Sequence, residues 1–245
     1  MEILGIIPAR FASTRFPGKP LVDINGMSMI QRVYTQAKKS KSLFKVIVAT
    51  DDSRIYKHVL DFGGEVVMTS VNHQSGTERC KEALKLSRVE CDMLINIQGD
   101  EPFIDPEQID KLASCFYIKG VQIATLVKKI TNLEDLFNTN VAKVVLNKNN
   151  EALYFSRCPI PFSRNYEEKD WLNQTTYYKH IGIYGFSKFN LNGVTKLEPS
   201  NLEKAESLEQ LRWIENGFKI TAAITSFESI SIDSPEDLFK VKDMV

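Results

Sequence analysis

The sequence predicts an α/β fold: a mostly parallel twisted sheet with helices on both faces and a partly antiparallel insertion. In the first part of the chain, short apolar runs alternate with helical segments, which is the pattern of parallel strands connected by helices. Over residues 122–156, strand-like runs follow one another without helices between them, so we expect an insertion on one side of the sheet in this region. The 245 residues suffice for one large domain that carries such an insertion.

Composition excludes several classes of function. Hydrophobic residues make up 43% of the chain and charged residues 25%, as in ordinary globular proteins. Lysine plus arginine equals aspartate plus glutamate at 31 each, so we expect no nucleic-acid partner. We see neither a signal peptide nor an apolar run of about 20 residues, and expect a cytoplasmic protein with no membrane partner. The four cysteines lack the spacing of a zinc site or disulfide framework: Cys80, Cys91, Cys115 and Cys158.

The first strand leads into a basic loop. Residues 1–7 are apolar and β-prone, and we expect Pro8 to end the strand because proline has no amide proton for a sheet ladder. The stretch IIPARFASTRFPGKP then carries Arg10, Arg15 and Lys19. Open α/β sheets bind ligands beyond the carboxyl ends of their strands, and cations with free backbone N–H groups suit a triphosphate there. GxGxxG and GxxxxGK(S/T) are both absent, so side chains would supply the charge; a solvated basic loop is the alternative.

The segments that follow alternate as the fold requires. An S-x-x-Q capping box at Ser28 opens a helix. Two glycines, Gly63 and Gly64, close the next helix. The predicted order is helix 28–39, strand 45–50, a helix from residue 51, and strand 65–68.

A second polar loop, HQSGTER, spans residues 73–79. Ser75, Gly76 and Thr77 can begin the next helix and leave free N–H groups beside the ligand site. Taken alone, an ordinary helix cap explains the same residues.

An acidic residue follows the next predicted strand, residues 92–98. Asp100 is a natural Mg²⁺ ligand there, because this ion takes one or two protein carboxylates and completes its shell with phosphate and water. The alternative is an acidic turn before a helix. Asp105 and Pro106 already supply that helix start, which favours a functional role for Asp100.

Three strand-like runs make up the start of the insertion: residues 122–130, 142–147 and 152–156, with a hairpin turn at 148–150. Two prolines keep residues 157–164 extended. Residues 164–176 are polar and lack periodicity, so we expect a mobile loop.

The run KHIGIYGF predicts a strand over residues 179–186 with one polar face. His180, Gly182 and Tyr184 alternate along that face, and isoleucines take the opposite one. The glycine between the two rings leaves space for a polar ligand. A histidine and tyrosine hydrogen-bonded within the core are the alternative.

The last segments predict helix 201–216, strand 218–225 and a short strand 229–232. The helix has an apolar stripe formed by Ala205, Leu208 and Leu211. Glu209, Gln210 and Arg212 lie off that stripe, where solvated side chains are usual. Asp233 follows the last strand, just ahead of another helix start.

Seven motifs occur in one order across nearly the whole chain: PARFASTRFPGK, HQSGTER, INIQGDEP, LYFSR with IPF, KHIGIYGF, LEQLR and IDSPEDL. Together they closely resemble the 3-deoxy-manno-octulosonate (Kdo) cytidylyltransferases of Gram-negative bacteria. The resemblance implies a Rossmann-like nucleotidyltransferase fold in a single domain, 1–245, with a smaller sugar-binding and dimerisation lobe within about 130–190. It also implies a homodimer and Mg²⁺-dependent transfer of CMP from CTP to Kdo, with release of pyrophosphate, for lipopolysaccharide assembly.

The resemblance also assigns roles to residues. The implied catalytic set is Asp100, Asp233, Lys19 and Arg10, of which the two aspartates are the metal ligands. The implied nucleotide-binding set is Arg10, Arg15, Lys19, Ser75, Gly76, Arg79 and Gln98. The implied sugar-binding set is Gln98, Arg157, His180, Tyr184, Glu209 and Gln210. Arg157 is the natural partner for the substrate carboxylate, because a guanidinium can pair with it through two hydrogen bonds.

In the implied mechanism, the anomeric hydroxyl of the sugar attacks the α-phosphorus of CTP in line, and positioning and charge stabilisation dominate. Three alternatives stay open at this point. One is an enzyme for another acidic sugar, such as a sialate or an amino analogue of Kdo. A second is a nucleotide-binding module without catalysis, which would not need both acids. The third is a glycosyltransferase, whose usual Asp-x-Asp motif is missing around Asp100.

Overall fold

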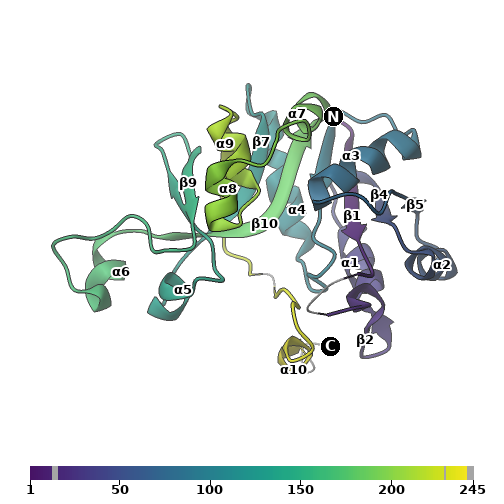
Figure 1. Ribbon diagram of the computed structural model, residues 1–245, viewed down its shortest axis with the longest axis horizontal. Coiled ribbons are helices and arrows are strands. Elements are labelled where there is room, and N and C mark those ends of the chain that lie inside the picture. Colours follow the sequence, from purple (N-terminus) through teal and green to yellow (C-terminus); the bar gives the residue numbers. More distant parts are fainter. Residues whose placement is uncertain (13–15, 229, 242–245) are drawn as a thin grey trace.

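One mixed sheet organises the structure (Figure 1). The computed structural model describes residues 1–12, 16–228 and 230–241. Within these residues, nine strands form one sheet whose main path has the order β11-β7-β10-β6-β1-β4-β5. The strands of the path are β1 (Ile3–Ala9), β4 (Leu43–Thr50), β5 (Val66–Met68), β6 (Met93–Asn96), β7 (Ile123–Lys129), β10 (Tyr178–Ser187) and β11 (Ile220–Thr225). Only β10 on this path runs antiparallel to its neighbours, so the prediction of a mostly parallel sheet is confirmed.

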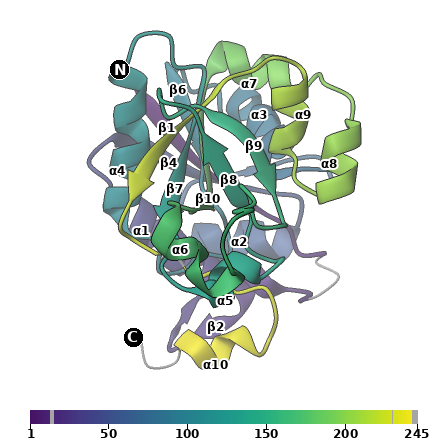
Figure 2. The same ribbon diagram turned by 90° about the vertical axis from the view of Figure 1, so that its left-hand side faces the viewer.

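Helices cover both faces of this sheet, as predicted (Figure 2). One face carries α1 (Met29–Ala37), α2 (Ser53–Asp61) and α4 (Pro106–Ser114). The other carries α3 (Gly76–Ser87), α7 (Lys188–Val194), α8 (Asn201–Glu206) and α9 (Gln210–Glu215). Three short 3₁₀ turns lie at Lys19–Leu21, Cys115–Tyr117 and Glu168–Asp170. No helix among the described residues combines the length and the apolar character that a membrane crossing needs.

The first strand extends through Pro8 to Ala9, so the expectation that Pro8 ends it is wrong. The ladder between β1 and β6 ends at the pair of Ile6 and Asn96, and Ile97 N donates to Ile6 O. Alternate residues of a strand point their backbone groups to the same neighbour, so Pro8 faces β6 beyond the end of that ladder. Its missing N–H therefore costs no sheet hydrogen bond.

The predicted helix 201–216 is broken into α8 and α9, so the prediction of one long helix is wrong. Ser207 ends α8 with a φ of 52°, a left-handed conformation that a right-handed helix cannot continue through. Ala205 is exposed, although the stripe predicted it buried. Gln210 and Arg212, expected on a solvated face, are buried where α9 packs on the sheet.

A group of elements after β7 extends from the main path of the sheet (Figure 1). It contains the predicted hairpin, β8 (Lys143–Leu146) and β9 (Ala152–Ser156), with α5 (Leu133–Phe137) and α6 (Trp171–Gln174). We call these elements the lobe. Residues 164–176 are not an irregular loop as expected, because α6 lies within them. Trp171 is buried in a small separate core with Leu136 and Tyr177, and burying so large a ring stabilises the segment.

The end of the chain crosses back to the first helix. After β11, residues 230–232 form no strand, and the other end of the strand predicted at 229–232 lies outside the described residues. Helix α10 (Asp237–Val241) follows. Ile232 and Val241 are buried against Ile24 and Met29. Ile24 belongs to the small hairpin of β2 (Asp23–Ile24) and β3 (Met27–Ser28), and Met29 follows it directly. This packing fixes the C-terminal segment beside the loop that follows β1.

Candidate active site

A polar cleft of about 340 Å³ lies beyond the carboxyl ends of β1 and β6. Its walls are Pro8, Ala9, Arg10, Lys19, Pro20, His73, Gln74, Ser75, Gly76, Arg79, Gln98, Gly99, Asp100 and Asp233. These include the whole predicted nucleotide-binding set apart from Arg15, which lies outside the described residues. A larger groove of about 1060 Å³ between α3 and α7 contains none of the predicted site residues.

Two carboxylates and one ammonium meet in this cleft. Lys19 Nζ donates to Asp100 Oδ2 at 2.7 Å and lies 3.7 Å from Asp233 Oδ1. The Lys19 side chain is 14% exposed, so this contact is shielded from water on most sides. Because both carboxylates lie so close to the same nitrogen atom, they face a common point. The structure therefore brings together two acids that are far apart in the sequence.

Two features of the backbone place these acids. At Gly99, a Cβ would lie 2.7 Å from Pro8 O, so only glycine lets the end of β6 pass this close to β1 and carry Asp100 to the cleft. On the other side, Ile232 N donates to Asp100 O at 3.0 Å. The burial of Ile232 and this hydrogen bond hold the next residue, Asp233, beside Asp100.

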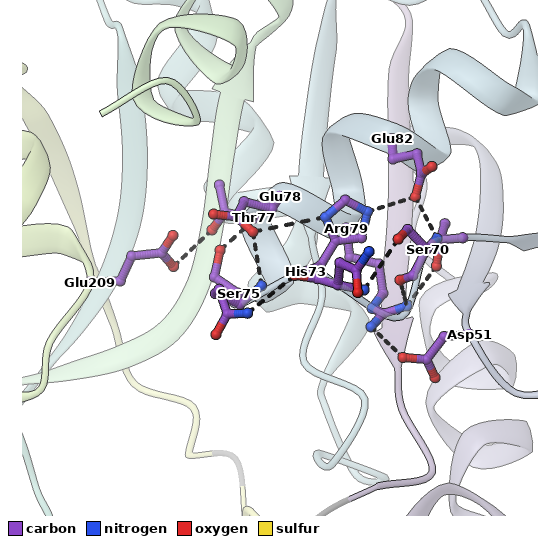
Figure 3. Close-up of polar contacts among 12 residues, drawn as sticks. Asp51, Ser70, His73, Ser75, Thr77, Glu78, Arg79, Glu82 and Glu209 are labelled. Atoms are coloured by element: carbon purple, nitrogen blue, oxygen red, sulfur yellow. Dashed lines mark hydrogen bonds and ion pairs between the residues drawn. The ribbon is translucent and has the colours of Figure 1, made fainter. Parts of the chain in front are cut away.

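The first turn of α3 forms the opposite wall. Ser75 Oγ accepts from Glu78 N at 3.2 Å and so caps the helix, as the sequence predicts. Arg79 is 4% exposed and donates to Asp51 Oδ2 and to Thr69 Oγ1, both at 2.6 Å (Figure 3). These bonds tie the helix to the residues that follow β4 and β5. The guanidinium of Arg79 is thus largely committed to protein contacts at the edge of the cleft.

Glu209 connects this helix to α9. Thr77 Oγ1 donates to Glu209 Oε2 at 2.9 Å, and Figure 3 shows the carboxylate directed toward the first turn of α3. Burial raises the pKa of Glu209, while the hydroxyls of Ser75 and Thr77 act in the opposite direction. A residue of the predicted sugar side therefore touches the helix that begins the predicted nucleotide side.

An irregularity in β10 shapes the rest of the predicted sugar side. His180 and Ile181 pair with Val127 and Leu126, but Tyr184 is the residue that pairs with Thr125, so two extra residues bulge from β10. Positions four apart in a regular strand would be about 13 Å apart. The bulge instead brings the rings of His180 and Tyr184 to 5.1 Å. They do share one side of the strand, as predicted, and bulges of this kind are common beside active sites.

Side chains from β7 and from the residues that follow β6 satisfy carbonyl groups of the bulge. Gln98 Nε2 donates to Gly182 O at 2.7 Å, and Thr125 Oγ1 donates to Ile183 O at 2.8 Å. Gln98 thus supports the bulge from the floor of the cleft.

Three buried donors on β10 and α9 have no partner among the described residues: Tyr184 Oη beside the bulge, and Gln210 Nε2 and Trp213 Nε1 on α9, whose Trp213 ring lies 4.9 Å from that of Tyr184. Buried polar groups are normally hydrogen-bonded, so unpartnered ones mark a place where a ligand or water completes the set. Burial raises the pKa of Tyr184 well above its usual value, so this phenol is a hydrogen-bond donor at neutral pH. Burial also lowers the pKa of His180 to about 3, so its imidazole is neutral.

Arg157 lies away from the cleft lining. Its guanidinium donates to the carbonyl oxygens of Glu206, Ser207 and Thr139, at 2.6, 3.3 and 3.0 Å. The contacts with Glu206 and Ser207 satisfy carbonyls at the end of α8. The structure does not bring its guanidinium into the cleft, and its role toward a substrate carboxylate stays a prediction.

Sequence reasoning did not single out three supporting residues: Asp51, Thr77 as a partner of Glu209, and Thr125. A hydroxyl in the apolar run of β7 was the available signal for Thr125, because a buried strand rarely contains a polar group without a partner. The contacts of Asp51 with Arg79 and of Thr77 with Glu209 join segments that are distant in the sequence, so no local sequence pattern predicts them.

The acids of the cleft fit a divalent cation. Among the described residues, no group of three or more histidine, cysteine, aspartate or glutamate side chains is arranged as a metal site. Two converging carboxylates, Asp100 and Asp233, are nevertheless the number that Mg²⁺ takes when phosphate and water complete its shell.

Comparison with known proteins agrees with this geometry. A family model described as cytidylyltransferase matches residues 4–220, and the chain belongs to this family. The 3-deoxy-manno-octulosonate cytidylyltransferase of Parabacteroides distasonis is 57% identical over 244 residues, 98% of this chain and 96% of that protein. The protein of the same name from Thermodesulfovibrio yellowstonii is 49% identical, over 97% and 96%. The family resemblance predicted from the seven motifs is thus confirmed.

A solved structure shares the whole architecture. It is titled CMP:2-keto-3-deoxy-manno-octonic acid synthetase complexed with CTP, and it matches with a TM-score of 0.92 and 39% identity. The match covers 100% of this chain and 98% of that chain. A cytidylyltransferase from Leptospira borgpetersenii, at 18% identity and a TM-score of 0.64, shares the fold.

Proposed function

We propose that this protein transfers CMP from CTP to the anomeric hydroxyl of Kdo, releasing pyrophosphate and forming CMP-Kdo for lipopolysaccharide assembly. The observation that carries the proposal is the meeting of Lys19, Asp100 and Asp233 in a cleft lined by the start of α3. The names of the relatives and of the CTP complex support the same substrates.

The nucleotide side has the groups that a triphosphate needs. Arg10 and Lys19 supply positive charge, and the N-terminus of α3 adds backbone N–H groups at Ser75 and Gly76. Arg10 is exposed and can follow the phosphates, whereas Lys19 is held by the two acids. Both would stabilise the charge that develops on the departing pyrophosphate.

Asp100 and Asp233 would hold Mg²⁺. When bound, this ion neutralises charge on the α-phosphate and lowers the pKa of the attacking hydroxyl. The protein's own part is to keep both carboxylates directed to one point, through the packing of Ile232 and the close approach at Gly99. Little covalent work falls to other side chains, because phosphoryl chemistry depends mainly on positioning and charge.

The sugar would lie against the β10 bulge. Tyr184 Oη and Gln210 Nε2, two of the buried donors without a partner among the described residues, would bind oxygen atoms of the sugar acid. His180, Glu209 and Gln98 complete this side, and Arg157 is the proposed partner of the carboxylate.

The lobe would contribute to a homodimer. Large apolar side chains are exposed there, with Leu153 of β9 at 55% and Phe162, between β9 and α6, at 72%, and a second copy could cover them. Sedimentation analysis should give twice the mass of one chain, and Phe162→Glu should shift the protein toward a monomer. A monomeric wild-type protein would contradict this part of the proposal.

The decisive test is pyrophosphate release from CTP and Kdo, with and without a chelator. We expect release that depends on both substrates, stops with chelator and returns with Mg²⁺. A panel of sugar acids, including a sialate and an amino analogue of Kdo, separates the related activities. Faster release with one of these than with Kdo would replace Kdo as the assigned substrate. CTP binding without release with any of them would indicate a binding module.

A further inference from the structure

The hydroxyl of Thr125 lies under the β10 bulge with no exposure to solvent. Its oxygen is 2.8 Å from Ile183 O, 3.3 Å from Ile181 O and 2.9 Å from His180 Nε2. The two carbonyl oxygens can only accept hydrogen bonds, whereas an imidazole nitrogen can donate or accept.

The number of protons on the Thr125 hydroxyl fixes the direction of its hydrogen bond with His180. A threonine hydroxyl has one proton, and two oxygens at 2.8 Å repel each other unless a proton lies between them. The Thr125 proton is therefore directed to Ile183 O. Toward His180 the hydroxyl can offer only a lone pair, so Nε2 must carry a proton and donate it.

The protonation state of the second ring nitrogen, Nδ1, follows from this. The imidazole is neutral, because burial lowers its pKa to about 3, so a proton on Nε2 leaves Nδ1 bare. Phe155 packs edge-on at 5.2 Å and Tyr184 lies at 5.1 Å, which restrict the orientation of the ring. His180 is only half-buried, and Nδ1 is its remaining polar ring atom.

We propose that Thr125 is a positioning residue of the sugar site, which fixes His180 in the tautomer that leaves Nδ1 free to accept a hydrogen bond from a sugar hydroxyl. This inference rests on the proposed function. It gives His180 a defined role, in which the ring recognises a donor group. The ring does not pair with the substrate carboxylate, since neither a neutral ring nor a bare nitrogen attracts an anion.

Nitrogen NMR on the wild-type protein tests the tautomer directly and does not require activity. With ¹⁵N-labelled histidine, long-range proton–nitrogen spectra should show Nε2 of His180 as the protonated nitrogen and Nδ1 as the unprotonated one, unchanged from pH 5 to 8. His180→Asn identifies the signals by their loss. A proton on Nδ1, or a doubly protonated ring in this pH range, overturns the proposal.

Kinetics of two variants test the positioning role. Thr125→Val removes the hydroxyl at constant shape, and we expect the KM for Kdo to rise at least about tenfold, as for one lost hydrogen bond, while the KM for CTP changes less than about twofold. Thr125→Ser keeps the hydroxyl and should restore Kdo use. Thr225→Val is the matched control, because that buried hydroxyl lies on β11, outside the predicted site, and accepts from the amide of Phe227.

The outcomes separate this inference from the proposed function. An unchanged KM for Kdo in Thr125→Val, or an equal rise in both KM values, overturns the positioning role. If Thr125→Val fails to fold, the wild-type spectrum and Thr125→Ser still decide, since the Ser variant must keep both the tautomer and Kdo use. A wild-type protein that ignores Kdo but shows the expected spectrum contradicts the proposed substrate and leaves the tautomer standing.

Discussion

The two sides of the candidate active site differ in the charge of their polar groups. The nucleotide side is built from charges: Lys19 with two carboxylates, and Arg79 with Asp51. The sugar side contains a neutral His180 and a Tyr184 whose phenol stays protonated, both because of burial. A triphosphate and a metal ion demand charge, whereas recognition of sugar hydroxyls depends on matched donors and acceptors. Loss of a charge should therefore affect the first side strongly, and loss of hydrogen-bond geometry should affect the second selectively.

The largest effect should follow loss of a carboxylate on the nucleotide side. Asp100→Asn keeps the shape and removes the charge, and we expect turnover to fall by at least about a hundredfold, or about 3 kcal/mol of charge stabilisation. Steady-state kinetics over a range of Mg²⁺ concentrations measures it. Asp61→Asn, an exposed acid at the end of α2, is the control and should leave turnover unchanged. Near wild-type turnover of Asp100→Asn at saturating Mg²⁺ would count against the metal site.

The second-largest effect should follow loss of the ion pair between Asp51 and Arg79, which lies at the edge of the cleft. Asp51→Asn leaves the buried guanidinium of Arg79 without its counter-charge, and we expect the free energy of unfolding to fall by about 2 kcal/mol. Urea denaturation measures the loss. Arg54→Ala breaks an exposed ion pair with Asp52 and should shift the midpoint less. Equal midpoint shifts in the two variants would show that the pair of Asp51 and Arg79 stabilises the fold no more than an exposed ion pair does.

Arg157→Ala distinguishes the two sides of the site. We expect the KM for Kdo to rise about tenfold or more, with little change for CTP, because the proposed partner of Arg157 is the sugar carboxylate. Titrations with each substrate at saturation of the other measure the effect. A large loss of CTP affinity would move Arg157 to the nucleotide side. A loss of stability with both KM values unchanged would leave it only the observed contacts with the α8 carbonyls.

The smallest effect concerns pH on the sugar side. His180 has a pKa of about 3 when folded against 6.5 when unfolded, so the unfolded state takes up the proton first as pH falls. The stability present above pH 6.5 is therefore lost as pH drops toward 3. Relative to His180→Gln, wild-type protein should lose about 1 kcal/mol of unfolding free energy between about pH 6.5 and 5.5. Parallel pH dependence of the two proteins would contradict a neutral, buried His180.

Much of the fold was predictable because its signals are local. The caps at Ser28, Ser75 and Asp105 each act through a hydrogen bond to a residue two or three positions away, and all three begin helices as expected. The break at Ser207 was not predictable in this way. No glycine or proline marks it, and the burial of α9 against the sheet outweighs the helical pattern of the sequence.

The sequence by itself determined the family, the alternation of strands and helices in the first part of the chain, and the two loops where a triphosphate and a metal ion could bind. Only the tertiary structure decided that Asp233 lies beside Asp100 and that Arg157 contacts α8 carbonyls. It also decided that a bulge brings the ring of His180 next to that of Tyr184. The reason is physical. Motifs and caps depend on neighbours within a few residues, whereas these contacts depend on strand order and register and on the burial of Ile232 at the far end of the chain.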